Sequence, residues 1–146
     1  MCSAKGMKIM LAVDLHGSPE HTLAAALPLL ERLGERVDVV YLSEARMNIP
    51  AGSGAKQDVR YAEWQAARDK EEAAMKALME LIPEPIRGKG LIEPGVPRTA
   101  LVSLSRDYDH VITGTRSPRG KLARLVLGSI ADTLVREAHC TSTVIR

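Results

Sequence analysis

The stretch 114–129 carries the residue types that bind a phosphate group. Gly114 ends an apolar segment, and the pair Gly128-Ser129 opens an expected helix. Ser117 and Gly120 lie in the loop between them. Backbone N–H groups and the positive end of a helix dipole can converge on an anion in such a loop. Four cations in the same stretch can help to neutralise a polyphosphate and its divalent ion: Arg116, Arg119, Lys121 and Arg124.

This pattern has a second interpretation, because glycines also mark turns and surface cations are usually solvated. Asp14 also has more than one interpretation, since it can contact a ligand, cap a helix or form a turn. The four histidines are scattered, without a cysteine or carboxylate at metal-ligand spacing. No serine lies in a nucleophile-elbow setting. We therefore expect no catalytic residue and no metal site made by the protein.

The order of apolar segments predicts the elements that position these residues. Short apolar runs predict strands at 8–14, 37–42, 91–93 and 110–114, and a β-branched stretch predicts a last strand at 141–145. Apolar residues at helical spacing predict helices at 18–34, 59–82, 98–106 and 128–138. This alternation predicts an α/β fold, an open doubly wound five-stranded parallel sheet with four helices. If the first and fourth strands are neighbours, the strand ends that carry Asp14 and Gly114 face one crevice.

Local signals add detail to these elements. Ser18 is expected to cap the first helix, with Pro19 at its first position, and Gly34 to end it. The stretch 43–56 predicts a mobile surface loop, and Gly88 and Gly90 predict a break before a weak third strand. The buried face of the long helix is expected to contain Trp64, Ala67, Met75, Leu78, Met79 and Ile82.

Composition is typical of a single soluble domain, which we expect to span 1–146. The formal net charge of +2 is too balanced to predict nucleic-acid binding. No targeting segment and no apolar run of membrane-spanning length are visible, so we expect no membrane partner. The two cysteines, Cys2 and Cys140, fit a reducing cytoplasm, and we expect their thiols to be functionally unimportant.

Several segments combine into the pattern of a known family. After the stretch 114–129 come an Ala-Asp-Thr-Leu-Val-Arg helix and a terminal Thr-Val-Ile-Arg. Near the start, Ala12-Val13-Asp14 precedes an Ala- and Leu-rich helix opened by Ser18. Glu93-Pro94-Gly95-Val96-Pro97 precedes the third helix, and Asp109 precedes the fourth strand. Together these segments resemble the universal stress protein family over Lys8 to Arg146.

The resemblance implies an adenine nucleotide alpha hydrolase-like fold with the strand order 3-2-1-4-5. It implies ATP or another adenine nucleotide as the ligand, with Mg or Mn as the accompanying ion. Asp14 and the end of the second strand, near Tyr41 and Leu42, would face the nucleoside. Gly114 and Gly128-Ser129 would meet phosphate. The implied binding residues in full are Val13, Asp14, Leu42, Gly114, Arg116, Ser117, Gly120, Gly128, Ser129 and Ile130.

The loop departs from the family's ATP-binding pattern, which is Gly, two residues, Gly, nine residues, then Gly-Ser or Gly-Thr. Ser117 replaces the inner glycine, and ten residues separate it from Gly128. Pro118 removes a backbone donor and biases Ser117 towards extended geometry. We therefore expect weakened binding of an adenine nucleotide, in the micromolar range or weaker.

The leading prediction is a nucleotide-binding regulatory protein in stress response or signalling, which needs no catalysis. The resemblance implies a homodimer through the strand 141–145, whose β-branched residues suit pairing at a sheet edge. Its output would pass through a regulatory protein partner. One alternative is a dimeric interaction module that has this fold and no nucleotide. Another is an ATP-consuming enzyme, whose substrate domain would find little room in 146 residues.

Overall fold

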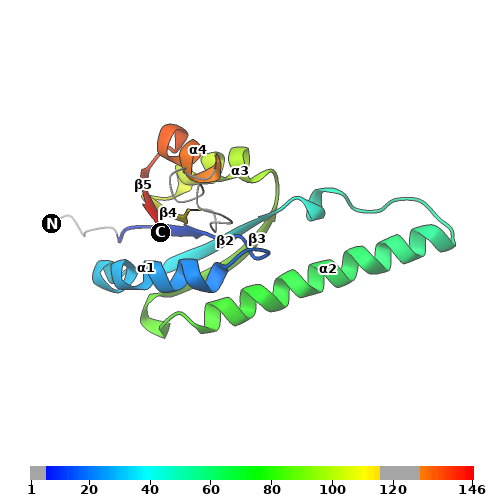
Figure 1. Ribbon diagram of the computed structural model, residues 1–146, viewed down its shortest axis with the longest axis horizontal. Coiled ribbons are helices and arrows are strands. Elements are labelled where there is room, and N and C mark those ends of the chain that lie inside the picture. The colour runs from blue at the N-terminus through cyan, green and yellow to red at the C-terminus, as the bar shows by residue number, and fades with distance from the viewer. Residues whose placement is uncertain (1–5, 116–128) are drawn as a thin grey trace, which may run out of the picture.

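Five parallel strands form one sheet in the order β3-β2-β1-β4-β5 (Figure 1). The computed structural model describes residues 6–115 and 129–146. The strands are β1 (Ile9–Ala12), β2 (Val37–Ser43), β3 (Arg87–Pro94), β4 (His110–Gly114) and β5 (Thr141–Ile145). The predicted fold class and strand order are confirmed.

Helices cover both faces of this sheet. The α-helices within the described residues are α1 (Pro19–Leu33), α2 (Ala55–Glu80), α3 (Pro97–Leu104) and α4 (Ser129–Glu137). α1 and α2 lie on one face, and α3 and α4 lie on the other (Figure 1). Short 3₁₀-helices occupy η1 (Ala45–Met47), η2 (Glu84–Ile86) and η3 (Ser105–Asp107). Within residues 6–115 and 129–146, each helix is either too short or too polar to cross a membrane.

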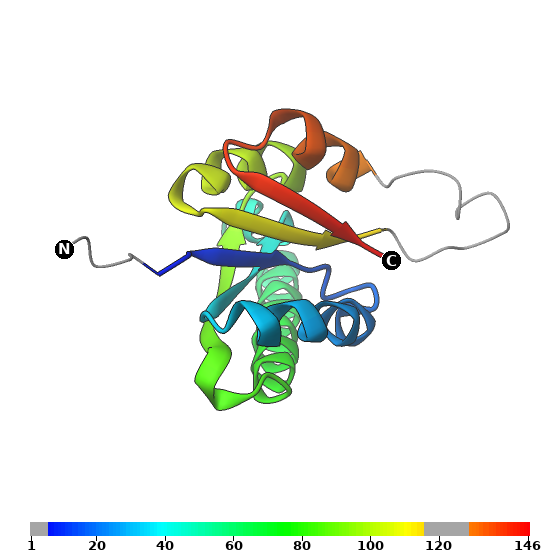
Figure 2. The ribbon, with the colours of Figure 1, turned by 90° about the vertical axis from the view of Figure 1, so that its left-hand side faces the viewer.

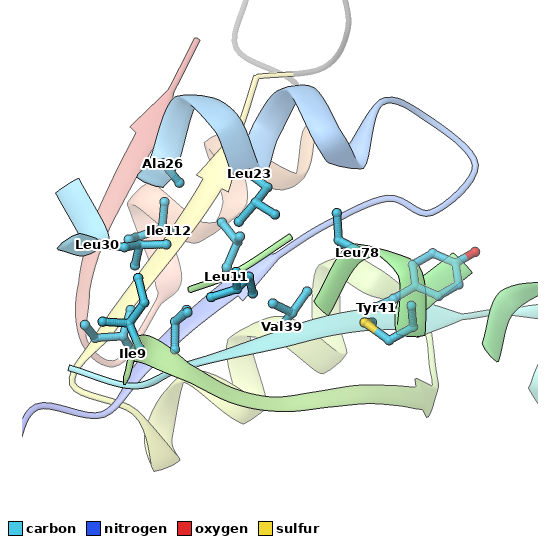
Figure 3. Packing of buried hydrophobic residues seen from close by; sticks show 13 residues of the cluster. Ile9, Leu11, Leu23, Ala26, Leu30, Val39, Tyr41, Leu78 and Ile112 are labelled. Carbon is cyan, nitrogen blue, oxygen red and sulfur yellow. The ribbon is translucent and has the colours of Figure 1, made fainter. Parts of the chain in front are cut away.

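An aliphatic core lies on each face of the sheet. Side chains alternate along β1, so that Ile9 and Leu11 pack under α1 and α2 while Met10 and Ala12 pack under α3. Figure 3 shows the first of these cores, in which Leu23 and Ile112 lie beside Leu11. Because β1 is buried on both faces, its sequence is a continuous apolar run rather than an alternating one.

The first helix begins and ends at the predicted residues, but its N-terminal cap differs from the prediction. Gly34 has a left-handed backbone (φ 68°), and its N–H donates to the Leu30 carbonyl. Ser18 occupies the N-cap position, but its side chain makes no capping hydrogen bond, so that expectation is wrong. Pro19 at the first helical position suits the helix start without such a bond, because its missing N–H would have no helical partner.

The long helix α2 is longer than predicted, and its buried face is shorter. It begins at Ala55 rather than at residue 59, and η1 occupies part of the predicted loop. Ala67 is exposed and Trp64 is only half-buried, so their assignment to the core is wrong. The N-terminal half of α2 extends beyond the sheet (Figure 1), which leaves no core beneath it. The buried positions of α2 are later in the chain, at Glu71, Met75 and Leu78, and the buried Ile82 follows the end of the helix at Glu80.

The third strand is longer than the weak strand predicted, because Gly88 and Gly90 lie inside β3 rather than before it. A Cβ at Gly88 would overlap the Asp38 carboxylate and the Val37 carbonyl of the neighbouring strand. A Cβ at Gly90 would lie 2.9 Å from Met75 Cγ of α2. Both glycines therefore permit close approach of other elements.

The Asp38 carboxylate ties the amino end of β2 to two neighbours. It accepts a hydrogen bond from the Lys89 N–H of β3 at 2.8 Å and from the Tyr108 hydroxyl at 2.9 Å. Burial, together with the hydrogen bond to Asp38, raises the pKa of Tyr108. The contact with Lys89 lies where the register between β2 and β3 shifts, so Asp38 satisfies a backbone donor at an irregular point of the sheet.

We predict that Tyr108→Phe lowers the free energy of unfolding by about 1.5 kcal/mol, the net contribution of a hydrogen bond to a charged group. Urea denaturation measures this. Tyr61→Phe is the matched control, because the Tyr61 side chain is exposed and its hydroxyl has no hydrogen-bond partner among the described residues. Equal unfolding free energies for the two variants would contradict a stabilising role for the Tyr108 hydroxyl.

Candidate functional site

The strand order brings the ends of β1 and β4 together. The two strands are paired with Ala12 opposite Thr113, so Val13 and Gly114 leave the sheet side by side. The carboxyl ends of these strands and the first turns of α1 and α4 lie on the same side of the molecule (Figure 2). Because the chain winds in opposite directions from β1 and from β4, this edge is the switch point at which open α/β sheets bind ligands.

Asp14 lies exposed in the turn that follows β1. One of its carboxylate oxygens, Oδ1, accepts a hydrogen bond from the His16 N–H at 3.0 Å, and its carbonyl accepts one from the Gly17 N–H. Asp14 therefore forms the turn after β1, which was one of its predicted roles. The second oxygen, Oδ2, has no hydrogen-bond partner among the described residues, and a Cβ at Gly17 would lie 3.2 Å from it. Gly17 thus leaves one Asp14 oxygen accessible.

Tyr41 and Leu42 reach the site from the end of β2 in different ways. The Tyr41 ring meets the His16 ring edge-on, with centroids 5.8 Å apart. Figure 3 shows its hydroxyl directed away from the core. Burial and the carboxylates of Glu71, Asp14 and Glu44 raise the pKa of Tyr41 to about 12. The Leu42 side chain is buried in the core under α3, which leaves its backbone for a ligand.

A buried carboxylate adjoins this corner, and the sequence analysis missed it. Glu71 of α2 is only 3% exposed, and its Oε1 accepts a hydrogen bond from the Ser43 hydroxyl at 3.0 Å. Arg46 of η1 lies beside it, with Nε 3.6 Å from Oε2. We call Ser43, Arg46 and Glu71 the Glu71 clasp. The spacing 71, 75, 78 and 82 could have identified Glu71, because it places this residue on the helix face that buries Met75.

Gly114 has a packing role that its place in a loop motif did not predict. A Cβ there would lie 2.9 Å from Thr22 Oγ1 and 3.1 Å from Thr22 Cγ2, in the first turn of α1. The glycine therefore lets α1 approach the end of β4. On the opposite face, Ser129 opens α4, and its carbonyl accepts a hydrogen bond from the Thr133 hydroxyl at 2.8 Å. Ile130 is half-buried against the core under α3 and α4.

The remaining predicted site residues lie outside the described residues: Arg116, Ser117, Gly120 and Gly128, together with Pro118, Arg119, Lys121 and Arg124. Cys2 also lies outside them. Between them, residues 6–115 and 129–146 contain no cluster of three or more His, Cys, Asp or Glu side chains placed to hold a metal ion. Cys140 is half-buried, and burial raises the pKa of its thiol, which disfavours the reactive thiolate.

Comparison with known proteins agrees with this architecture. The model described as "Universal stress protein family" matches residues 7–146. Among solved structures, the chain is similar to the universal stress protein UspA of Lactobacillus plantarum, with 18% identity, 99% of this chain and 100% of that chain covered, and a TM-score of 0.65. A universal stress protein family member from Burkholderia pseudomallei has 18% identity, coverage of 97% and 98%, and a TM-score of 0.63.

A third similar structure was solved with a ligand. It is the universal stress protein from Archaeoglobus fulgidus in complex with dAMP, with 19% identity, 96% of this chain and 98% of that chain covered, and a TM-score of 0.56. A sequence search of curated proteins finds no match. At these identities the solved structures establish the fold.

We predict that Gly114→Ala lowers the free energy of unfolding by about 1–3 kcal/mol, because its methyl group overpacks against Thr22. In a Thr22→Ala background, which removes the two contacting atoms, most of this loss should disappear. Urea denaturation of the single and double variants measures the coupling between the two positions. If the two substitutions are additive, close packing is not what requires glycine at 114.

Proposed function

The chain belongs to the universal stress protein family, and on that premise we propose that it binds an adenine nucleotide and acts as a regulatory protein rather than an enzyme. The observation that carries the proposal is the pairing of β1 with β4, which brings the open carboxylate of Asp14 and the exit of Gly114 to one edge of the sheet. An adenine nucleotide is the proposed ligand because the A. fulgidus universal stress protein, which has a similar fold, was solved in complex with dAMP.

The distribution of charge supports one orientation of the nucleotide. At the exits of β1 and β2, burial raises the pKa of the Tyr41 hydroxyl, and the nearby carboxylates of Glu71, Asp14 and Glu44 raise it further. The sequence after Gly114 carries instead the four cations between Arg116 and Arg124. Phosphates are repelled by the carboxylates near Tyr41 and attracted by the cations that follow Gly114. We therefore propose that the nucleoside lies towards Val13, Asp14 and Leu42, and that the phosphates lie towards Gly114, Ser129, Ile130 and the loop 116–128.

A divalent ion fits this arrangement as a companion of the phosphates. The described residues contain no group of three or more His, Cys, Asp or Glu side chains that could hold Mg or Mn by themselves. Such an ion is usually bound through substrate phosphates and one or two carboxylates. When bound, such an ion would neutralise phosphate charge at the phosphate end of the site.

We predict that isothermal titration calorimetry with ATP, ADP and AMP gives dissociation constants in the micromolar range or weaker. Asp14→Ala should weaken binding about tenfold, because a contact with a charged acceptor contributes roughly 1.5–3 kcal/mol at most. Asp69→Ala, an exposed acid on α2, is the matched control and should bind as the unaltered chain does.

The titration also separates this proposal from its alternatives. Nanomolar affinity would refute the weakening expected from Ser117 and Pro118. Absence of heat and of a thermal shift with all three nucleotides at millimolar concentration would refute nucleotide binding and favour an interaction module. Turnover of ATP by the purified chain, lost in Asp14→Ala, would refute the non-enzymatic part.

We further propose that the chain forms a homodimer through β5. This strand has β4 on one side and no other strand of the described chain on its outer side. The His110 ring nitrogen lies 2.6 Å from the Thr143 hydroxyl, so a side-chain contact adds to the ladder that holds β5 to β4. A second copy of β5 can pair with the backbone groups on the outer edge. A regulatory partner protein would act on the resulting assembly.

We predict that Val144→Pro dissociates the dimer. The Ile145 carbonyl accepts from the Thr115 N–H, so the Ile145 backbone faces β4 and the Val144 N–H faces the outer edge. Proline at 144 removes that outer donor and keeps the bonds to β4, as edge strands tolerate. Sedimentation velocity should find a dimer for the unaltered chain and for Val144→Ala, and a monomer for Val144→Pro. A Val144→Pro variant that remains dimeric would place the interface elsewhere.

A further inference from the structure

The Glu71 clasp holds the exit of β2 by polar contacts from a helix on one face of the sheet. Ser43 is the last residue of β2 and is fully buried, and its hydroxyl donates to Glu71 Oε1 at 3.0 Å. Arg46 of η1 reaches Glu71 Oε2 with Nε at 3.6 Å and Glu72 Oε1 with Nη2 at 3.4 Å. The clasp therefore fixes both the end of the strand and the turn that follows it.

A second set of contacts from α2 extends the clasp along the helix. The Trp64 indole N–H donates to the Ala45 carbonyl at 3.0 Å, so α2 holds the backbone of η1 as well as its side chain. Arg68 lies over the Trp64 ring, 5.7 Å from its centroid, and pairs with Glu72. Ser43, Ala45 and Arg46 are thus held by two parts of α2, one at Trp64 and one at Glu71 and Glu72, directly after Tyr41 and Leu42 in the chain.

The packing of α2 against the sheet does not explain why the buried residue at position 71 is charged. Glu71 shares its buried face with Met75 and Leu78, where an apolar side chain would pack without loss of hydration. Its Oε2 atom and Arg46 Nε are buried, and neither makes a hydrogen bond with another described residue. Burying an ion pair with incomplete hydrogen bonding rarely adds stability, whereas it does select one geometry.

We propose that Glu71 is a positioning residue for the nucleoside end of the binding site. Its carboxylate holds Ser43 and Arg46 in one arrangement, and this fixes the backbone of Leu42 and the ring of Tyr41 that the nucleoside meets. This inference rests on the proposed adenine nucleotide site. Glu71 touches no ligand in this account, and it acts through the β2 exit. The phosphate end lies on the other side of β1, beyond its reach.

The test uses Glu71→Gln in the full-length chain, with Glu63→Gln on the same helix as the matched control, since Glu63 is exposed and has no salt bridge among the described residues. The glutamine can still accept from Ser43, but its amide N–H₂ faces the Arg46 guanidinium, so two donors oppose each other. Amide hydrogen exchange of the ligand-free chain should accelerate about tenfold at residues 43–47, and remain unchanged in β4.

Two fragments of the nucleotide, titrated by calorimetry, give the functional readout. The dissociation constant of adenosine should rise about fivefold to tenfold in Glu71→Gln, within the coupling range of contacting residues, while that of tripolyphosphate stays unchanged. Glu63→Gln should change neither. In the double variant Arg46→Gln with Glu71→Gln, the two amides can pair, so exchange and adenosine affinity should recover towards the unaltered chain.

The outcomes separate this inference from the function on which it rests. Unchanged exchange at 43–47, or equal weakening of adenosine and tripolyphosphate together with a lower melting temperature, would show that Glu71 serves stability alone and overturn the inference. Absence of recovery in the double variant would overturn the pairing with Arg46. If the unaltered chain binds neither adenosine nor ATP, the proposed function fails first, and faster exchange in Glu71→Gln would then identify a structural clasp without a ligand to position.

Discussion

The arrangement of the whole molecule depends on the central strand β1, which is enclosed on every side. Its four residues are at most 6% exposed, and it is hydrogen-bonded to β2 on one edge and to β4 on the other. A strand in that position must be apolar throughout, since water can reach none of its side chains. It also forces the chain to build outward in two directions, first to β2 and β3 and then to β4 and β5. The crevice at the ends of β1 and β4 is a direct consequence.

The sequence predicted the parts of this arrangement that depend on local pattern. Apolar runs located β1, β2 and β4, and a β-branched stretch located β5. The alternation of these strands with helices predicted that Asp14 and Gly114 would meet. The third strand was underestimated because Gly88 reads locally as a breaker. The reason for this glycine is the approach of Asp38, fifty residues earlier in the chain. Contacts of that kind have no local signature.

At the candidate site, too, local sequence pattern predicted some features, while others depend on contacts between distant parts of the chain. Asp14 and Gly114 were found from strand ends and a loop pattern, whereas the contact between Gly114 and Thr22 depends on how closely α1 packs. Trp64 was assigned to the core because it shares a helical face with Met75 and Ile82. Periodicity states which face of a helix is apolar, but it does not state where the sheet beneath that face ends. Glu71 was missed for the complementary reason, as an acid in a charged helix resembles a solvated one.

Buried polar groups supply the geometry that an aliphatic core leaves undetermined. The chain has no phenylalanine, and its core consists of Ile, Leu, Val and Met side chains, which tolerate small shifts of one layer over another. Asp38 fixes the amino end of β2 through two directed hydrogen bonds, and Glu71 fixes its carboxyl end through Ser43. One strand is therefore located at both ends by carboxylates, which hydrophobic packing alone would not achieve.

The carboxylates near Tyr41 determine which type of ligand group is favoured beside them. Glu71, Asp14 and Glu44 act together on the Tyr41 hydroxyl, and among the cations of residues 6–115 and 129–146 Arg46 opposes them there. Like charges gathered at a half-buried corner repel one another, and hydrogen-bond donors relieve that repulsion. A ribose and an exocyclic amino group are such donors, whereas a phosphate is an acceptor and adds to the repulsion. These carboxylates, of which Glu71 also positions the β2 exit, thus favour the nucleoside end of a nucleotide over its phosphate end.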